Sequence, residues 1–161
     1  MSVRVPVYDT GMLIALTDHK AKAVALHNGL RATPHRAVVL GPVLAQVWRP
    51  RPAVIHSLAG VLKDCTVPQA RASEPPVRGT NAGRPECIAC VTGPDVTDWR
   101  RIGTALGEAE LPAKKKPDAV DAWVALSAVK HGSAVIFTSD PEDIEAYLAV
   151  LNPVDVHVQP V

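Results

Sequence analysis

The chain has 161 residues, of which 47% are hydrophobic, 20% are charged and only 4% are aromatic. This composition is typical of one globular domain, residues 1–161, with a core of aliphatic side chains. The formal net charge of +1 excludes an overall basic field for nucleic acid, although a local basic rim would suffice for an RNA substrate. Three cysteines do not provide a disulfide framework.

No segment of the sequence indicates export or membrane insertion. The first residues run into Asp9 instead of a long apolar stretch, so no secretory signal is visible. The longest uncharged run, residues 37–48, contains Gly41 and Pro42 and is too short to span a bilayer. We therefore expect a cytoplasmic protein without membrane association.

Short apolar strands and helices alternate along the first 67 residues. Apolar runs that end in turn residues predict the strands, and helical spacing of apolar residues predicts the segments between them. The expected order is strand 3–9, helices 10–17 and 20–32, strand 35–40, helices 41–48 and 52–63, and strand 65–67.

Residues 71–96 break this pattern, because the stretch is rich in Pro and Gly and has almost no apolar periodicity. We predict an irregular insert there. It contains Cys87 and Cys90 in a C-x-x-C arrangement, which is compatible with half a zinc site or with a redox pair. Because no second pair and no suitably spaced His lies nearby, two unrelated thiols are the favoured interpretation.

Helical and strand patterns return after the insert. The expected order is helix 95–111, a basic run at 114–116, helix 118–131, strand 134–137, helix 141–151 and strand 154–158. Asp118 is a good N-cap, and Gly132 is a good stop for the same helix. Strands that alternate with helices favour an α/β fold with a parallel sheet covered on both faces.

Acidic residues occur where these strands end. Asp9 follows the first strand, Asp140 follows strand 134–137, and Asp118 and Asp121 lie at a helix start. Because the carboxyl ends of parallel strands meet at one edge of a sheet, we expect these side chains to converge. Gathered carboxylates repel each other, and a bound divalent cation is the usual remedy.

Three segments together resemble the PIN domain, a metal-dependent ribonuclease fold that includes the VapC-type toxins of toxin–antitoxin pairs. They are Asp9-Thr10 with the helix that follows, residues 120–125, and residues 137–140. The resemblance covers nearly the whole chain except the insert. It implies a three-layer α/β/α sandwich with a central, mostly parallel five-stranded sheet. It also implies a homodimer and an antitoxin partner.

The expected cofactor is Mg²⁺ or Mn²⁺, because hard cations prefer oxygen ligands and activate water for attack on a phosphodiester. Asp9, Asp121 and Asp140 are the predicted catalytic residues and metal ligands. Side chains that would bind through water or orient a ligand are Asp118, Asp143, Thr10, Thr138 and Ser139. For Asp118, N-capping is the favoured role.

Gln46 departs from the pattern, because PIN nucleases usually carry a Glu on the helix after the second strand. Gln keeps an oxygen ligand for the metal but removes one negative charge, so we expect weaker metal binding. Two alternatives stay open. Either three aspartates and an amide oxygen form a working site, or the protein is a weakly active or inactive member.

Basic residues that could contact RNA phosphates flank the acidic ones. The candidates are Arg49, Arg51, Lys114, Lys115 and Lys116. Solvated loop positions explain them equally well.

Three functions are compatible with these features. The favoured one is a Mg²⁺- or Mn²⁺-dependent endoribonuclease, resembling a VapC-type toxin. The second is a PIN-like fold that no longer cleaves and that binds RNA or protein. The third, phosphotransfer with Asp9 as acceptor, is disfavoured because no second Asp accompanies Asp9 before Asp18.

Overall fold

The computed structural model describes residues 4–68 and 93–161. These residues contain one sheet of five parallel strands in the order β3-β2-β1-β4-β5. The strands are β1 Val5–Tyr8, β2 Ala37–Val39, β3 Cys65–Thr66, β4 Ser133–Thr138 and β5 Asp155–Pro160. The helices are α1 Thr10–Thr17, α2 Ala21–Leu30, α3 Gly41–Val47, α4 Pro52–Leu62, α6 Val96–Glu108, α7 Ala119–His131 and α8 Pro141–Leu151.

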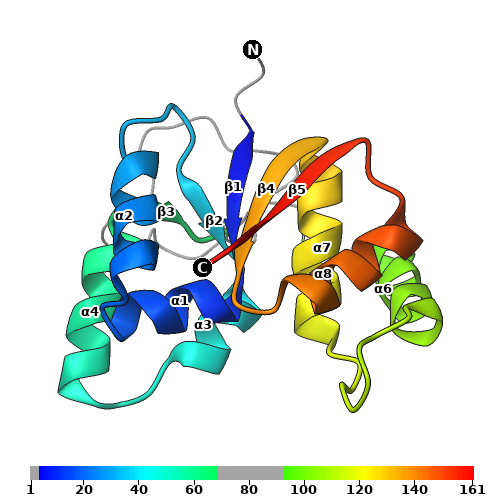
Figure 1. Ribbon diagram of the computed structural model, residues 1–161, viewed down its shortest axis with the longest axis horizontal. Coiled ribbons are helices and arrows are strands. Elements are labelled where there is room, and N and C mark those ends of the chain that lie inside the picture. Colours follow the sequence, from blue (N-terminus) through cyan, green and yellow to red (C-terminus); the bar gives the residue numbers. More distant parts are fainter. Residues whose placement is uncertain (1–3, 69–92) are drawn as a thin grey trace.

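Helices cover both faces of this sheet. The chain moves from β1 outward to β3 in one direction and from β4 to β5 in the other. Right-handed crossovers therefore place α1–α4 on one face and α6–α8 on the other, as Figure 1 shows. The predicted three-layer α/β/α sandwich with a parallel five-stranded sheet is confirmed.

The core lies around the two central strands, β1 and β4. Val7 pairs with Ile136 and Tyr8 with Phe137, and all four side chains are buried. Strands covered on both faces are apolar without alternation, which is why their sequences predicted buried strands. The Tyr8 hydroxyl lies 2.8 Å from Nδ1 of His27, which ties the end of β1 to α2.

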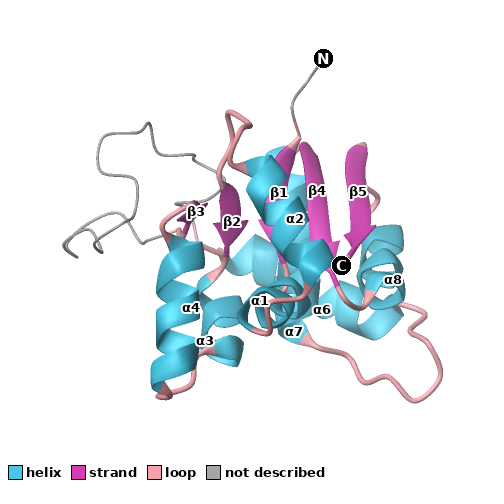
Figure 2. Ribbon diagram, turned by 60° about the vertical axis from the view of Figure 1, so that its left-hand side comes forward, coloured by secondary structure: helices cyan, strands magenta, loops and turns pink. Residues whose placement is uncertain are grey.

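The chain leaves β1 and β4 in opposite directions, so the loops after these two neighbouring strands diverge (Figure 2). Such a topological switch point is where open α/β sheets bind their ligands. The backbone N–H of Asp9 donates to the carbonyl of Phe137 at 3.0 Å and so holds the two strand ends together. The residues directly after the ends of β1 and β4 therefore lie side by side before the two loops separate.

Several element ends differ from the sequence-based expectation. The predicted helix 95–111 ends at Glu108, because Ala109 takes up an extended conformation and a loop then leads to Asp118. Its start is as expected, since Asp95 and Asp98 form a reciprocal capping box. Most of the predicted insert, including Cys87 and Cys90, lies outside the described residues. No helix within the described ranges is both long and apolar enough to cross a membrane.

Gly11 allows the first turn of α1 to approach the loop after β4. A Cβ atom on Gly11 would lie 2.1 Å from the Ser139 hydroxyl oxygen and 2.8 Å from the Ser139 backbone nitrogen. We expect Gly11→Ala to lower the free energy of unfolding by about 1–3 kcal/mol, because the backbone of Ser139 must shift. Thermal unfolding followed by circular dichroism measures this effect.

Gly103→Ala is the matched control, since Gly103 lies in α6 and a Cβ there meets nothing within 4 Å. This variant should be neutral or slightly stabilising, because Ala favours a helix more than Gly does. A Gly11→Ala protein as stable as Gly103→Ala would contradict the close approach.

Candidate metal centre

The side chains that follow β1 and β4 meet at the switch point. Asp9 is the N-cap residue of α1, directly after β1. Asp140 lies two residues beyond β4 and immediately before Pro141, the first residue of α8. The sequence thus predicted correctly that these two strand ends bring their aspartates together.

Asp9 is buried, with 4% of its surface exposed. The Thr138 hydroxyl donates a hydrogen bond of 2.7 Å to Oδ2 of Asp9, and it accepts one of 3.0 Å from the Asp140 backbone N–H. Among the described residues, Oδ1 of Asp9 has no hydrogen-bond partner. Burial raises the pKa of Asp9 and the charge of Asp140 adds to this increase, whereas the Thr138 hydrogen bond and the nearby backbone N–H groups of Thr10 and Gly11 oppose it. A buried oxygen without a donor is costly, and a cation would satisfy it.

Asp121 lies in the first turn of α7, and the charge of every other acidic residue of the site affects its pKa. Its pKa is raised to about 7, first by burial and then by the negative charges of Asp9, Asp118, Asp143 and Asp140. These five side chains, which we call the acidic cluster, are therefore near enough to interact through their charge. An excess of negative charge of this kind favours a bound cation.

Asp118 serves mainly as a helix cap, as predicted. Its Oδ1 accepts a 2.7 Å hydrogen bond from the Val120 backbone N–H. Its own backbone N–H donates to the Tyr147 hydroxyl at 2.9 Å. Tyr147 thus fixes the start of α7, a role that we did not predict. The available signal was its position seven residues after Asp140, which is two helical turns along the same face of α8.

Gln46 reaches the site through Thr10. The Thr10 hydroxyl donates to Oε1 of Gln46 at 2.5 Å, which places this amide beside the residue that follows Asp9. Oε1 is the Gln46 atom that was predicted to bind metal, and in this structure it accepts the hydrogen bond from Thr10. A carbonyl oxygen has two lone pairs, so this hydrogen bond leaves room for a second partner.

Lys115 lies against the acidic cluster. Its Nζ is 2.9 Å from Oδ1 of Asp140 and 3.0 Å from Oδ2 of Asp143. The Lys115 hydrogen bond lowers the pKa of Asp140, to which the Ser139 hydroxyl also donates at 3.3 Å. Lys115 was predicted to contact RNA phosphate, whereas in this structure its ammonium is paired with carboxylates.

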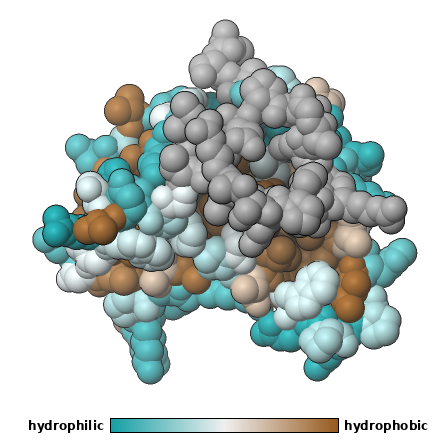
Figure 3. Space-filling view, turned by 180° about the vertical axis from the view of Figure 1, so that it is seen from behind, coloured by the Kyte–Doolittle hydropathy of each residue, from teal (hydrophilic) through white to brown (hydrophobic). Residues whose placement is uncertain are grey.

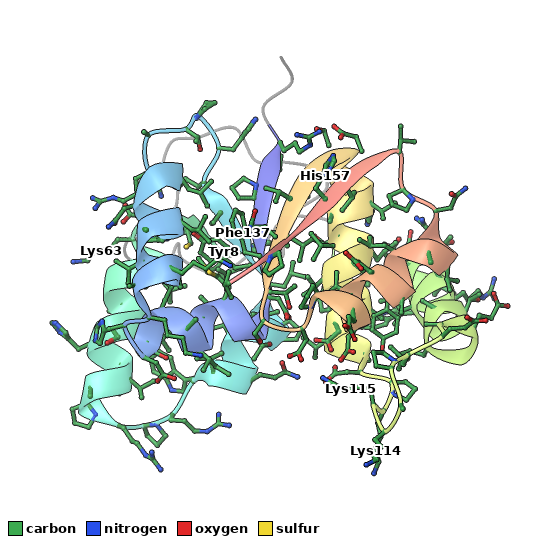
Figure 4. The ribbon with its side chains drawn as sticks, in the orientation of Figure 1. Tyr8, Lys63, Lys114, Lys115, Phe137 and His157 are labelled. Atoms are coloured by element: carbon green, nitrogen blue, oxygen red, sulfur yellow. The ribbon has the colours of Figure 1, made fainter. Side chains whose placement is uncertain are left out.

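The other predicted RNA-binding residues are exposed. Figure 4 shows Lys114 projecting from its loop away from the body of the molecule, while Lys115 turns toward the starts of α7 and α8. Arg49 donates to the neighbouring Trp48 carbonyl at 2.7 Å. Arg51 is the N-cap residue of α4, and Lys116 is exposed beside Lys115. Their positions allow contacts with a polyanion but do not identify one.

The donors of the cluster suit a hard cation, although the side chains are not closed around one. Carboxylate and amide oxygens are the ligands that Mg²⁺ and Mn²⁺ prefer. Over residues 4–68 and 93–161, no three His, Cys, Asp or Glu side chains converge closely enough to hold a metal ion as they stand. Asp140 is instead paired with Lys115, and Oδ1 of Asp9 is buried without a hydrogen-bond partner among the described residues.

No protein-family model matches this chain. No curated protein matches it. No solved structure matches it. The fold and the site therefore define its class: an α/β protein with a parallel sheet and an acidic cluster at the topological switch point. Because a fold of this kind supports many activities, function has to be argued from the site.

Proposed function

We propose that this protein is a Mg²⁺- or Mn²⁺-dependent endoribonuclease of the PIN type. The observation that carries the proposal is the buried Oδ1 of Asp9, which lacks a hydrogen-bond partner among the described residues and lies in the field of Asp121 and Asp140. A buried carboxylate oxygen without a hydrogen bond lowers the stability of the fold, so a structural role alone does not explain it. It is suited to a divalent cation.

A bound cation would stabilise charge on the phosphate and lower the pKa of a water molecule. Asp9, Asp121 and Asp140 would hold it, with Gln46 as a neutral oxygen donor. Thr138 fixes the orientation of the Asp9 carboxylate through its 2.7 Å hydrogen bond. Attack on the phosphodiester then depends on how these side chains position water and RNA at the edge of the sheet.

A VapC-type role adds three further elements to the proposal: a homodimer, an antitoxin partner and a cytoplasmic location. Trp48 and Trp99 are 45% and 51% exposed, which suits a protein interface, although Trp99 also packs edge-on against Trp123. Figure 3 shows apolar residues in several separate places among polar ones on one face of the molecule. Exposed tryptophans are common anchors of interfaces.

A second candidate function is a PIN-like module that binds RNA or protein without cleaving. Two observations favour it. Gln46 supplies no charge and accepts from Thr10, and Asp140 is paired with Lys115. Both weaken the site as a metal centre in this conformation.

Cleavage of a pool of structured RNAs, with and without Mn²⁺, distinguishes the two functions. We expect the wild-type protein to cut only with metal, and Asp9→Asn to reduce the rate by at least ~100-fold, because a ligand is lost. Gln46→Glu should increase the rate, since a carboxylate binds the cation more strongly than an amide and can still accept from Thr10. Gel analysis of end-labelled RNA gives the rates.

Cleavage by Gln46→Glu alone would support the second function, with the natural protein as a silenced nuclease. Equal cutting by wild-type protein and Asp9→Asn would indicate a contaminating nuclease and would contradict the proposal.

A further inference from the structure

Lys115 contacts two carboxylates of the acidic cluster at once. The distances from Nζ are 2.9 Å to Asp140 and 3.0 Å to Asp143, and the two acids come from the first turn of α8 and the residue before it. Its ammonium therefore already supplies positive charge on the α8 side of the site (Figure 4). Among the described residues, the ion pairs of Lys115 are with these two acids and not with Asp9 or Asp121.

The loop between α6 and α7 directs Lys115 inward. The Lys115 backbone N–H donates to the carbonyl of Pro112 at 3.0 Å, which closes a turn. Lys114, inside this turn, has a φ of 71°, in the left-handed region. This reversal points Lys114 outward and leaves Lys115 facing the cluster. The position of Lys115 thus follows from the backbone of the turn as well as from its charge.

The ion pair between Lys115 and Asp140 can open without unfolding, because the Lys115 side chain is 44% exposed and can move into solvent. Asp140 is likewise 54% exposed, whereas Asp143 is only 11% exposed. A divalent cation bound to Asp140 would lie within a few ångströms of this ammonium, and two cations at that separation repel each other. The two cations therefore compete for Asp140.

We propose that Lys115 is an internal counter-ion of the acidic cluster, which competes with a divalent cation for Asp140 and thereby sets the metal affinity. This inference rests on the proposed function. Metal binding displaces the ammonium from Asp140 and leaves it at the rim of the site. Lys115 then becomes available to a substrate phosphate only when metal is bound, which couples the phosphate contact to the loaded site.

Isothermal titration of the full chain with MnCl₂, at one neutral pH and one ionic strength, tests the competition. Lys115→Met removes the ammonium and keeps most of the side-chain stem. Lys116→Met is the matched control, because it makes the same charge change one residue away on an exposed side chain. Lys115→Arg keeps the charge. Thermal unfolding verifies that each variant is folded.

We expect the Mn²⁺ dissociation constant of Lys115→Met to fall about three- to tenfold below that of Lys116→Met, since a surface ion pair is modest in strength. Lys115→Arg should bind like the wild-type protein. Binding of Mn²⁺ by Lys115→Met alone would support the competition in its strongest form.

Equal affinities of the two Met variants would overturn the inference, because net charge would then explain the change. Weaker binding by Lys115→Met would also overturn it and would make Lys115 an organiser of the site. If the wild-type protein and every variant fail to bind Mn²⁺, the proposed function is contradicted, and so is the inference that rests on it.

Discussion

Asp9→Asn is expected to stabilise the metal-free protein while it removes Mn²⁺-dependent activity. Asp9 is 4% exposed, its Oδ1 has no partner among the described residues, and burial raises its pKa. Asn keeps the shape and the oxygen that accepts from Thr138, and it removes a buried charge from an acidic field. We expect the free energy of unfolding to increase by about 1 kcal/mol or more.

Thermal unfolding in a chelating buffer measures this change. Asp18→Asn is the control, because Asp18 is an exposed residue at the other end of α1, and its replacement should change the free energy of unfolding by less than about 0.5 kcal/mol. Opposite effects on stability and activity are typical of residues kept for function. If Asp9→Asn melts below the wild-type protein in chelator, Asp9 is a structural residue, and the metal-site interpretation loses its main support.

Asp121 is expected to make the metal-free protein less stable as the pH rises toward neutrality. Its folded-state pKa is raised to about 7, by burial and by four neighbouring carboxylates, whereas an unfolded aspartate titrates near pH ~4. A raised pKa contributes stability that is fully present below about pH 4 and is lost as the pH rises through about 7. Added Mn²⁺ should reverse this loss, because it stabilises the ionised form.

Unfolding by urea at a series of pH values in chelator gives the stability curve, and Asp121→Asn should flatten it between about pH 4 and 7. Asp155→Asn provides a control of opposite sign. The hydrogen bond from Ser133 and the contact with Arg4 hold the pKa of Asp155 at about 2, so its contribution is lost as the pH falls. Parallel curves for the wild-type protein and Asp121→Asn would show that Asp121 does not interact with the cluster.

Much of the fold was predictable because the strongest signals are local. The apolar run before Thr138, the cap at Asp118 and the stop at Gly132, whose φ is 81°, each predicted an element that the structure contains. The strand order did not follow from the sequence, since it depends on contacts between distant segments. The end of α6 at Glu108 was also missed, because the following loop is shaped by its own turn.

The site was predictable where a residue's place follows from a strand end. Asp9 and Asp140 were expected to meet for that reason, and the structure brings them together with Asp121. The support from Tyr147 and the contact of Gly11 with Ser139 were missed, because they join side chains and backbone across loops.

Three consecutive lysines are equivalent in sequence, and the structure separates them. The left-handed backbone at Lys114 sends one side chain outward and leaves Lys115 against Asp140 and Asp143. Periodicity and composition do not predict which lysine faces the acids, because the backbone of a tight turn determines it. The phosphate contact predicted for Lys115 stays a prediction, and the structure adds to it the pairing of Lys115 with two carboxylates.

X-ray diffraction from crystals soaked in MnCl₂, with data collected at the manganese absorption edge, tests most directly whether the acidic cluster is a divalent-cation centre. We expect one strong anomalous peak among Asp9, Asp121 and Asp140, with Lys115 moved away from Asp140. No peak at the cluster, with Asp140 still paired to Lys115 at saturating Mn²⁺, would contradict the metal centre and the ribonuclease proposal built on it.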